Sequence, residues 1–479
     1  MCWSGRRQPK NYKGWRAVLS VSIKERERYT MTLDDLKADY EERNPESKKM
    51  WQKASEILPG GISANVKFYS PFPLFMKEGH GAYLTDVDGH TYVDYAQSYG
   101  PLVLGHGREE IIDSMNEYLA SHGAILFGTP HEEEAVLAEK LHNYYPSMES
   151  IRYTNSGTEA TLLAIRTACA FTGRFKIAKF EGHYHGGYNE VLVSINPDVR
   201  KAGDVNHPVG VRESAGISDT KLEDTIILPF NNLEACKQIL TAHKDEIAGV
   251  IMEPLLGGTI PATKEFMDGF RELTKDLKIL LIFDEVKTGF RVGMGGAQGY
   301  YGIKPDLTTL GKIIGAGFPI GVLGGRKDIM EMAAPRGSGT SRISSSDILY
   351  HSGTYNGHPL ILHLGLKTLE ILDYEIEALF KNTELLKTEL KSFFAKHGIR
   401  VLTPGIGSMF HICVTDLAEI KDYRDLKKSD FDLRRRLDYA LYSEGIYNKP
   451  CKRYHMSAAH TDAVIDFTIE AYEKAFKRL

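Results

Sequence analysis

The sequence predicts an α/β protein in which helices cover a mostly parallel sheet and a smaller α+β domain follows. Beyond about residue 100, helical segments alternate with short apolar runs, a pattern typical of parallel sheets covered by helices. The chain has 479 residues, which is longer than one small hydrophobic core supports. We therefore expect one large domain and at least one smaller one.

The expected elements follow in chain order. Polar and apolar residues are spaced as in a helix over 33–58, and Pro59-Gly60-Gly61 ends it. Residues 83–94 alternate in polarity on both sides of Asp88-Gly89, which predicts a β-hairpin turning at these two residues. Further along, short apolar runs predict strands at 151–154, 176–180, 248–252 and 279–283.

The segment 194–220 interrupts this alternation. It contains several Pro and Gly residues and has no periodicity, so we expect a long mobile loop, a feature that is usually functional or disordered. A long helix over 359–372 precedes a C-terminal third with an α+β pattern. We expect a leader over 1–31, an N-terminal segment that packs with the small domain over 32–85, a large domain over 86–358 and a small domain over 359–479.

The composition excludes several classes of protein. A formal net charge of −4 and 25% charged residues are ordinary for a globular enzyme and give no reason to expect nucleic acid as a partner. No apolar run in the sequence reaches the roughly 18 residues that a membrane span needs. The cysteines are scattered without a C-x-x-C pair, which favours a reducing, cytoplasmic location over a disulfide framework.

Residues 1–30 differ from the rest of the chain. They are rich in Arg and Lys, and their acids are Glu25 and Glu27. A basic segment of this kind is typical of an organelle transit peptide, but a disordered leader upstream of Met31 has the same composition. Serine is too sparse for a confident targeting prediction, so we favour the leader and leave the transit peptide open.

Lys312 and Asp284 carry the strongest chemical signal. Lys312 follows Gly311, and an amine placed after a glycine can approach a flat cofactor. Asp284 ends the apolar run 279–283, where a carboxylate loses hydration worth several kcal/mol unless it meets a cation. That cation is either Arg291 or a protonated pyridine nitrogen. Together the amine and the acid indicate a pyridoxal phosphate (PLP) enzyme, in which the lysine forms a Schiff base and the aspartate keeps the pyridine protonated.

A phosphate site is expected at residues 155–160. The segment Asn155-Ser156-Gly157-Thr158-Glu159-Ala160 follows a strand and opens a helix. Free N–H groups and the positive dipole end of such a helix favour a phosphate, and Ser156 and Thr158 add hydroxyl donors. Taken alone, the segment is more typical of an ordinary N-cap with a glycine turn. Because Lys312 and Asp284 indicate a PLP enzyme, we nevertheless interpret the segment as a phosphate site.

Tyr184 is the candidate for stacking on the cofactor ring. It lies in Glu181-Gly182-His183-Tyr184-His185-Gly186-Gly187, and an aromatic residue between glycines can lie flat on a π-system. The alternative is a half-buried aromatic residue that closes a loop. His183 and His185 have no third ligand at fitting spacing, so we expect no metal site.

With these residues in hand, the chain resembles the class III aminotransferases, which are fold type I PLP enzymes. The similarity runs from about Leu36 to the C-terminus and is strongest to the glutamate-1-semialdehyde 2,1-aminomutase branch. It is carried by an ordered series of motifs at 155–160, 180–186, 251–254, 283–291, 307–315 and 353–360.

The resemblance implies the PLP-dependent transferase fold type I, with a mostly parallel seven-stranded sheet in the large domain. It implies that Lys312 forms the Schiff base, Asp284 binds the pyridinium nitrogen and Tyr184 stacks on the ring. The phosphate is expected on Ser156, Gly157 and Thr158. The remaining cofactor-binding residues are expected to be Asn231, Glu253 and, reaching the neighbouring subunit of a homodimer, Gly353 and Thr354.

The substrate residues implied by the resemblance include two departures from the aminomutase pattern. Tyr99 matches an aromatic position at the substrate mouth, and 194–220 corresponds to a gating loop. Lys67 stands where the aminomutase has an arginine for the substrate carboxylate, and a point charge does not reproduce that residue's fork. Lys452, next to Arg453, stands where the aminomutase has a glutamate. The departures favour an aminotransferase whose acidic substrate meets Lys67, Lys452 or Arg453.

The sequence thus predicts PLP-dependent transfer of an amino group from an amino-acid donor to a carbonyl acceptor in a ping-pong cycle. The alternative is a glutamate-1-semialdehyde 2,1-aminomutase that forms 5-aminolevulinate. A third interpretation is a cofactor-binding regulator that has lost turnover. A nicotinamide reductase is set aside, because the glycine-rich segment 293–299 does not fit G-x-G-x-x-G between a strand and a helix.

Overall fold

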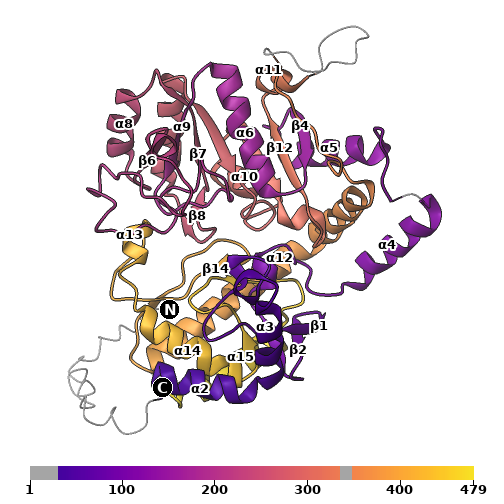
Figure 1. Cartoon of the computed structure of the whole chain (residues 1–479), viewed down its shortest axis with the longest axis vertical. Coiled ribbons are helices and arrows are strands. Elements are labelled where there is room, and N and C mark those ends of the chain that lie inside the picture. The colour runs from indigo at the N-terminus through magenta and orange to yellow at the C-terminus, as the bar shows by residue number, and fades with distance from the viewer. Residues whose placement is uncertain (1–30, 124, 335–347) are drawn as a thin grey trace, which may run out of the picture.

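A computed structural model describes residues 31–123, 125–334 and 348–479. The predicted leader over residues 1–30 therefore lies outside the described residues. In the part that is described, no helix is both long enough and apolar enough to cross a bilayer. Figure 1 shows a larger unit, built around the central sheet, and a smaller unit formed by both ends of the chain, with the long helix α12 joining them.

The larger unit contains the predicted seven-stranded, mostly parallel sheet. The strands β11, β10, β7, β5 and β6 run parallel to one another, and β12 is antiparallel to both β11 and β4. Across the sheet the order is β4 (Ser150–Thr154), β12 (Gly321–Gly325), β11 (Leu307–Gly311), β10 (Leu280–Asp284), β7 (Ile247–Met252), β5 (Lys176–Phe180) and β6 (Thr225–Leu228). All four strands predicted from short apolar runs belong to it.

Helices cover both faces of this sheet, which explains why its strands are apolar on both sides. Leu280 and Ile282 of β10 pack in the core that includes α6 (Gly157–Thr172). Leu281 and Phe283 point to the opposite face and pack with α9 (Lys264–Asp276). Since successive strand residues face opposite sides, a strand buried on both faces reads as an unbroken apolar run.

The carboxyl ends of the parallel strands meet at one edge of the sheet, and this edge positions the site. Asp284 ends β10 opposite Thr309 of β11. Lys312 follows the end of β11, and Tyr184 lies shortly after β5. Ser156 follows β4, which also runs parallel to β11 because β12 reverses between them. In open α/β sheets this edge is where ligands bind.

The helix predicted over 359–372 is longer than expected. It runs as α12 (Pro359–Lys396) and buries Leu372, Leu379, Leu386 and Phe393 along one face. The apolar repeat continues without Pro or Gly until Gly398, so nothing in the sequence ends the helix at Leu372.

The smaller unit combines the N-terminal segment with the C-terminal third. Its sheet has the order β1 (Met76–His80), β2 (Tyr83–Asp86), β3 (Thr91–Asp94) and β16 (Ile446–Tyr447), and β16 pairs with β3 in parallel. The hairpin β2–β3 confirms the turn predicted at Asp88-Gly89. The domain boundary expected at 85/86 falls inside this hairpin, because β3 pairs with β2 and with the C-terminal strand.

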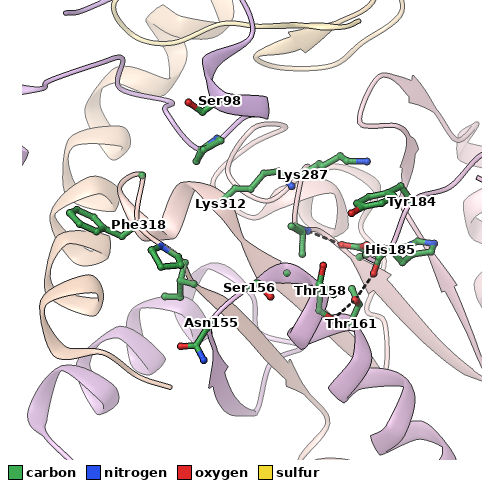
Figure 2. Close-up of a pocket in the computed structure, with 18 residues that line it drawn as sticks. Ser98, Asn155, Ser156, Thr158, Thr161, Tyr184, His185, Lys287, Lys312 and Phe318 are labelled. Carbon is green, nitrogen blue, oxygen red and sulfur yellow. Dashed lines mark hydrogen bonds and ion pairs between the residues drawn. The ribbon is translucent and has the colours of Figure 1, made fainter. Parts of the chain in front are cut away.

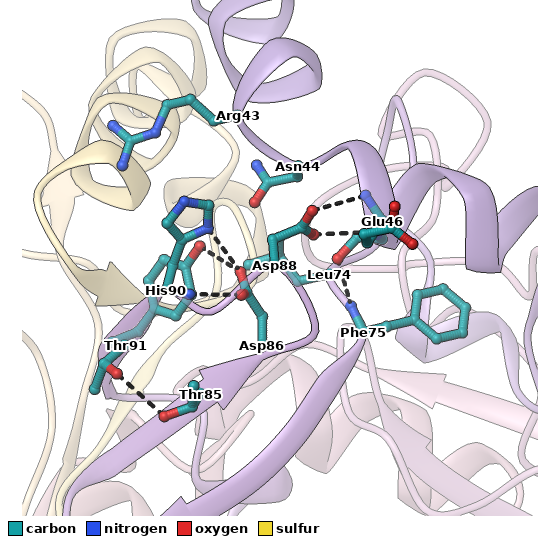
Figure 3. A network of polar contacts seen from close by, with 12 residues as sticks. Arg43, Asn44, Glu46, Leu74, Phe75, Thr85, Asp86, Asp88, His90 and Thr91 are labelled. Carbon is teal, nitrogen blue, oxygen red and sulfur yellow. Dashed lines mark hydrogen bonds and ion pairs between the residues drawn. The ribbon is translucent and has the colours of Figure 1, made fainter.

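The helix predicted over 33–58 is divided in two, α2 (Leu33–Arg43) and α3 (Pro45–Ser55). Pro45 has no N–H and disfavours a helical residue before it, so Asn44 leaves the helix with φ −123° and ψ 54°. Figure 3 shows how the hairpin turn closes the new helix end. The Asp88 carboxylate accepts from the N–H groups of Glu46 and Ser47 at 2.7 and 2.9 Å, which are free at a helix start.

The segment 194–220 contains no helix or strand until α7 (Asp219–Glu223) begins, as the loop prediction requires. Isolated bridges join Val193 to Arg212 and Gly203 to Pro208. The remaining helices are α4 (Glu109–His122), α5 (Glu132–Tyr144), α8 (Leu233–Ala242), α10 (Gly296–Tyr301), α11 (Lys327–Met330), α13 (Tyr423–Leu426), α14 (Phe431–Ser443) and α15 (Asp462–Phe476). Short strands complete the fold: β8 (Leu255–Leu256), β9 (Ile260–Pro261), β13 (Val401–Leu402), β14 (Met409–Phe410), β15 (Cys413–Val414) and β17 (Tyr454–His455).

Candidate active site

One cavity at the carboxyl edge of the sheet brings the main predicted residues together. It has a volume of about 460 Å³, within the usual range for small-molecule sites. Figure 2 shows Lys312, Tyr184, Ser156 and Thr158 around it, from three different parts of the chain. Asp284 and Gly157 also line it. Residues 312 and 284 thus face the same space, as a shared cofactor requires.

Lys312 is held in an unusual backbone conformation immediately after β11. Its φ is +50°, a left-handed value that non-glycine residues adopt rarely and that recurs at functional sites. Burial, and after it the like charge of Lys287, lowers the pKa of Lys312 to about 8. The sign follows from desolvation, which disfavours the charged ammonium form. At neutral pH this amine is therefore neutral more often than an ordinary lysine is.

We predict that the lowered pKa of Lys312 can be measured in the protein without cofactor. Because the neutral amine is the nucleophile, its labelling by acetic anhydride should rise about tenfold per pH unit and level off above a pH of about 8. Peptide mass spectrometry measures this labelling, with the exposed Lys304 as internal reference. A plateau that is reached only at the pH of an ordinary lysine, about 10.4, would contradict the prediction.

Asp284 is a buried carboxylate whose partners are not arginine or lysine side chains. It accepts from His185 Nδ1 at 2.8 Å, from the N–H of Val286 at 3.1 Å and from Thr309 Oγ1 at 3.3 Å. The alternative of an ion pair with Arg291 is wrong. The Arg291 guanidinium instead donates to the carbonyl oxygens of Gly100 at 2.7 Å and of Met456 at 2.9 Å.

The start of α6 forms a second wall of the cavity. Ser156 caps this helix, since its Oγ accepts from the N–H of Glu159 at 3.1 Å. Within the described residues, the N–H groups of Gly157 and Thr158 donate to no protein group. A Cβ at Gly157 would lie 2.6 Å from Val286 Cγ1, so only glycine fits there. Ser156 thus acts as an ordinary cap and leaves the next two N–H groups free for an anion.

Tyr184 lies over a buried ion pair. Its N–H donates to Glu253 Oε2 at 2.9 Å, and the other oxygen of Glu253 accepts from Lys287 Nζ at 2.6 Å. Lys287 Nζ also lies 5.3 Å from the centre of the Tyr184 ring. Although burial opposes ionisation, Lys287, followed by His183 and His185, holds the pKa of Glu253 well below its usual range. Glu253 therefore stays charged beneath the cavity and fixes Tyr184 and Lys287.

The comparisons with known proteins identify the family. A family model described as aminotransferase class-III matches residues 65–472. This chain belongs to the class III aminotransferases. A glutamate-1-semialdehyde 2,1-aminomutase of Methanopyrus kandleri is 38% identical over 92% of this chain and 99% of the relative. One of Legionella pneumophila (strain Lens) is 40% identical over 90% and 99%.

Solved structures of aminotransferases have the same fold. An omega-transaminase from Sphaerobacter thermophilus matches with a TM-score of 0.84 and 32% identity, covering 90% of this chain and 97% of that one. A glutamate-1-semialdehyde aminomutase from Pseudomonas aeruginosa, in complex with PMP, matches with a TM-score of 0.82 over 93% and 97%. At 21% identity the latter likeness concerns the fold alone. The predictions of the family, the fold, amino-group transfer and a PLP-dependent enzyme are confirmed.

The residues of this aminotransferase fit PLP by their own chemistry. The cavity has an amine in Lys312, a buried carboxylate in Asp284 and free N–H donors at the start of α6. These groups match the aldehyde, the ring nitrogen and the phosphate of the cofactor. This fit supports the predicted roles, which remain predictions.

Four residues that were predicted to bind the cofactor do not line this cavity. The Asn231 side chain forms hydrogen bonds with the backbone of neighbouring loops. It donates to the carbonyl oxygens of Pro261 and Lys421 at 3.2 and 2.8 Å and accepts from the N–H of Thr263 at 2.9 Å. Glu253 lies beneath the cavity wall. Gly353 lines a separate hollow beside Arg152, and Thr354 is exposed next to it.

Two of the four predicted substrate residues lie away from the cavity. Lys67 is exposed and its Nζ donates to Ser63 Oγ at 2.8 Å. Tyr99 donates through its hydroxyl to the carbonyl oxygen of Val66 at 2.9 Å, while its neighbour Ser98 lines the cavity. Neither Lys67 nor Tyr99 lines this cavity, and their predicted contact with the substrate stays a prediction.

Lys452 and Arg453 line a second cavity, of about 670 Å³, that adjoins the first. Tyr184 and Lys287 line both cavities, so a molecule can extend from one into the other. Sequence reasoning missed Lys287 and Val286 as cavity residues. Their position in the sequence could have indicated this, because both follow directly after Asp284 at the end of β10.

Proposed function

We propose that Lys312 and Asp284 are the catalytic residues of a PLP-dependent aminotransferase whose amino donor or carbonyl acceptor is acidic. One observation carries this proposal: an amine with a lowered pKa and a buried carboxylate face the same cavity, next to the free N–H groups of α6. A cavity of this size without the amine, the carboxylate and the free N–H groups could bind a small molecule but could not transfer an amino group.

Each residue has one task in the reaction. The bound cofactor supplies an electron sink for the substrate carbon and carries the amino group between half-reactions. Asp284 holds the proton on the ring nitrogen, and His185, which donates to it at 2.8 Å, keeps its carboxylate in place. Lys312 would hold the cofactor through its amine and would move a proton at the substrate α-carbon. Tyr184 stacks on the ring, and Ser156, Gly157 and Thr158 hold the phosphate.

Arg453 and Lys452 are proposed to attract the substrate carboxylate. Both line the adjoining cavity, and the Arg453 guanidinium donates a hydrogen bond to the carbonyl oxygen of Gly257. The partly buried guanidinium of Arg453 loses hydration, which a carboxylate can replace, whereas Lys452 is exposed beside it and adds a second positive charge.

A glutamate-1-semialdehyde 2,1-aminomutase is the second candidate. It is favoured by the relatives with that name, which are 38% and 40% identical to this chain. It is disfavoured by the positive charge of Lys452, which the resemblance places where the aminomutase has a glutamate.

A donor and acceptor screen tests these two functions. We expect purified protein with PLP to change its absorbance when an acidic amino donor is added, and to recover with a keto acid. An aminomutase would instead convert glutamate semialdehyde to 5-aminolevulinate without an added donor. Absence of any spectral change across the screen would leave the regulator that has lost turnover as the better interpretation.

We also propose a homodimer that acts in the cytoplasm. Gly353 and Thr354 lie away from the cavity of their own chain, which suits a role at the phosphate of a partner. Mixing Lys312→Ala and Thr354→Ala subunits should then restore more activity than either variant has alone. The cysteines of the described residues are free, which supports a reducing compartment.

A further inference from the structure

The second cavity carries more positive charge than the proposed carboxylate contact needs. Besides Lys287, which is neutralised by Glu253, it is lined by Lys427, Arg435, Lys452 and Arg453. Among the described residues that line it, Glu213 is the single carboxylate, and its Oε2 accepts from the N–H of Asn196 at 2.9 Å. Lys427, which follows α13, and Arg435 of α14 thus add cations that form no ion pair with a carboxylate among the described residues.

Neighbouring residues on the same elements show how unusual this is. Arg434 and Arg436 have their own acids on α14, Asp438 at 2.9 Å and Asp432 at 3.5 Å. Arg435, between them, lines the cavity, and no carboxylate of the described chain lies within ion-pair distance. A half-buried guanidinium without a carboxylate partner loses hydration and gains no ion pair in return.

The same contrast holds beside α13. Lys428 pairs with Asp425 at 2.8 Å, whereas Lys427 lines the cavity and its Nζ donates to the neutral Asn196 Oδ1 at 2.8 Å. Lys427 is an exposed residue, and partial burial of its ammonium lowers its pKa although the charge of Glu213 opposes this shift.

We propose that this basic cavity is a subsite for a second anionic group of the substrate, at the end remote from the reacting carbon. The proposal rests on the proposed function, because it extends the same substrate. Arg453 and Lys452 would meet the anionic group nearer the cofactor, and Arg435 and Lys427 would meet the distal one. The substrate class is then an amino or carbonyl compound with two anionic groups, which is larger and more charged than glutamate semialdehyde.

Calorimetry on the PLP-loaded protein tests the subsite without requiring turnover. The probes are the dicarboxylates glutarate, adipate, pimelate and suberate, each compared with the monocarboxylate of the same length. We expect the best dicarboxylate to bind about 10- to 100-fold more tightly than its partner, as one charge-assisted contact provides. Comparing glutarate with 4-phosphonobutyrate, which has the same three methylene groups between its acids, shows whether the distal group is a carboxylate or a phosphonate.

Matched variants locate the subsite. Arg435→Gln and Lys427→Gln should remove most of the dicarboxylate advantage, while Arg436→Gln and Lys428→Gln should leave it unchanged. Equal binding of dicarboxylates and monocarboxylates to the unaltered protein would overturn the proposal, and so would an equal effect of Arg435→Gln and Arg436→Gln. If amino donors react but dicarboxylates gain nothing, the subsite fails and the proposed function stands. If dicarboxylates bind as expected but no donor reacts, the proposed function fails alone.

Discussion

Replacing Lys312 by alanine should reduce amino transfer by more than about 10⁴-fold. A positioned acid–base group alone supplies about 10²–10⁴-fold, and Lys312→Ala also removes the amine that attaches the cofactor. The purified wild-type protein should be yellow and the variant should not bind PLP covalently. Stopped assays of donor consumption and absorbance spectra measure both effects.

The control for this experiment comes from the second lysine of the cavity. Lys287 also faces the cavity, and burial lowers the pKa of both lysines, but the Lys287 ammonium is held by Glu253 at 2.6 Å. Borohydride reduction followed by peptide mapping should therefore place the cofactor on Lys312. Attachment to Lys287 would overturn the assignment. The exposed Lys304→Ala should keep full activity.

Asp284→Asn should lower kcat by about 10³-fold while the fold is retained. The asparagine keeps the shape and can still accept from His185, but it loses the negative charge. Removing one partner of a buried charge pair costs about 2–5 kcal/mol, and each 1.4 kcal/mol is about tenfold in rate. Steady-state kinetics with the best donor of the screen measures the loss, and circular dichroism checks the fold.

The role of the charge can be separated from that of the contacts. N-methylated PLP has a permanently positive ring nitrogen and needs no aspartate to hold a proton there. We expect it to recover part of the activity of Asp284→Asn, because the charge is then supplied by the cofactor analogue. Thr309→Val removes only the contact at 3.3 Å and should lower kcat by less than about tenfold. A loss as large as that of Asp284→Asn would show that packing, not charge, explains the effect.

The sequence by itself predicted the elements that have strong local signals. Short apolar segments identified four strands of the sheet, and Asp88-Gly89 identified the hairpin turn. The prediction from the sequence failed where a single residue overrides a periodic pattern, since Pro45 divides the expected first helix. It also ended α12 too early, because the limit at Leu372 had no Gly or Pro to support it.

The candidate site shows the same division. Lys312, Asp284, Tyr184 and the start of α6 were predictable, because each directly follows or lies near the end of a strand, and the ends of parallel strands meet at one edge. The positions of Asn231, Lys67 and Tyr99 could not be predicted from the sequence. The side chains of Asn231 and Tyr99 donate to carbonyl oxygens of loops, and Lys67 is exposed. Loop conformations depend on distant partners that spacing alone does not reveal.

What the sequence determined is therefore the chemistry of the site: an amine, an acid and an anion-binding helix start in a fixed order along an α/β chain. The tertiary structure decided which cations remain without an acid. Arg434, Arg435 and Arg436 are identical side chains in a row, and the sequence gives no reason to separate them. Only the packing of α14 places Arg435 toward a cavity beside Lys452 and Arg453, because the side that a helical residue faces is set by what the helix packs against.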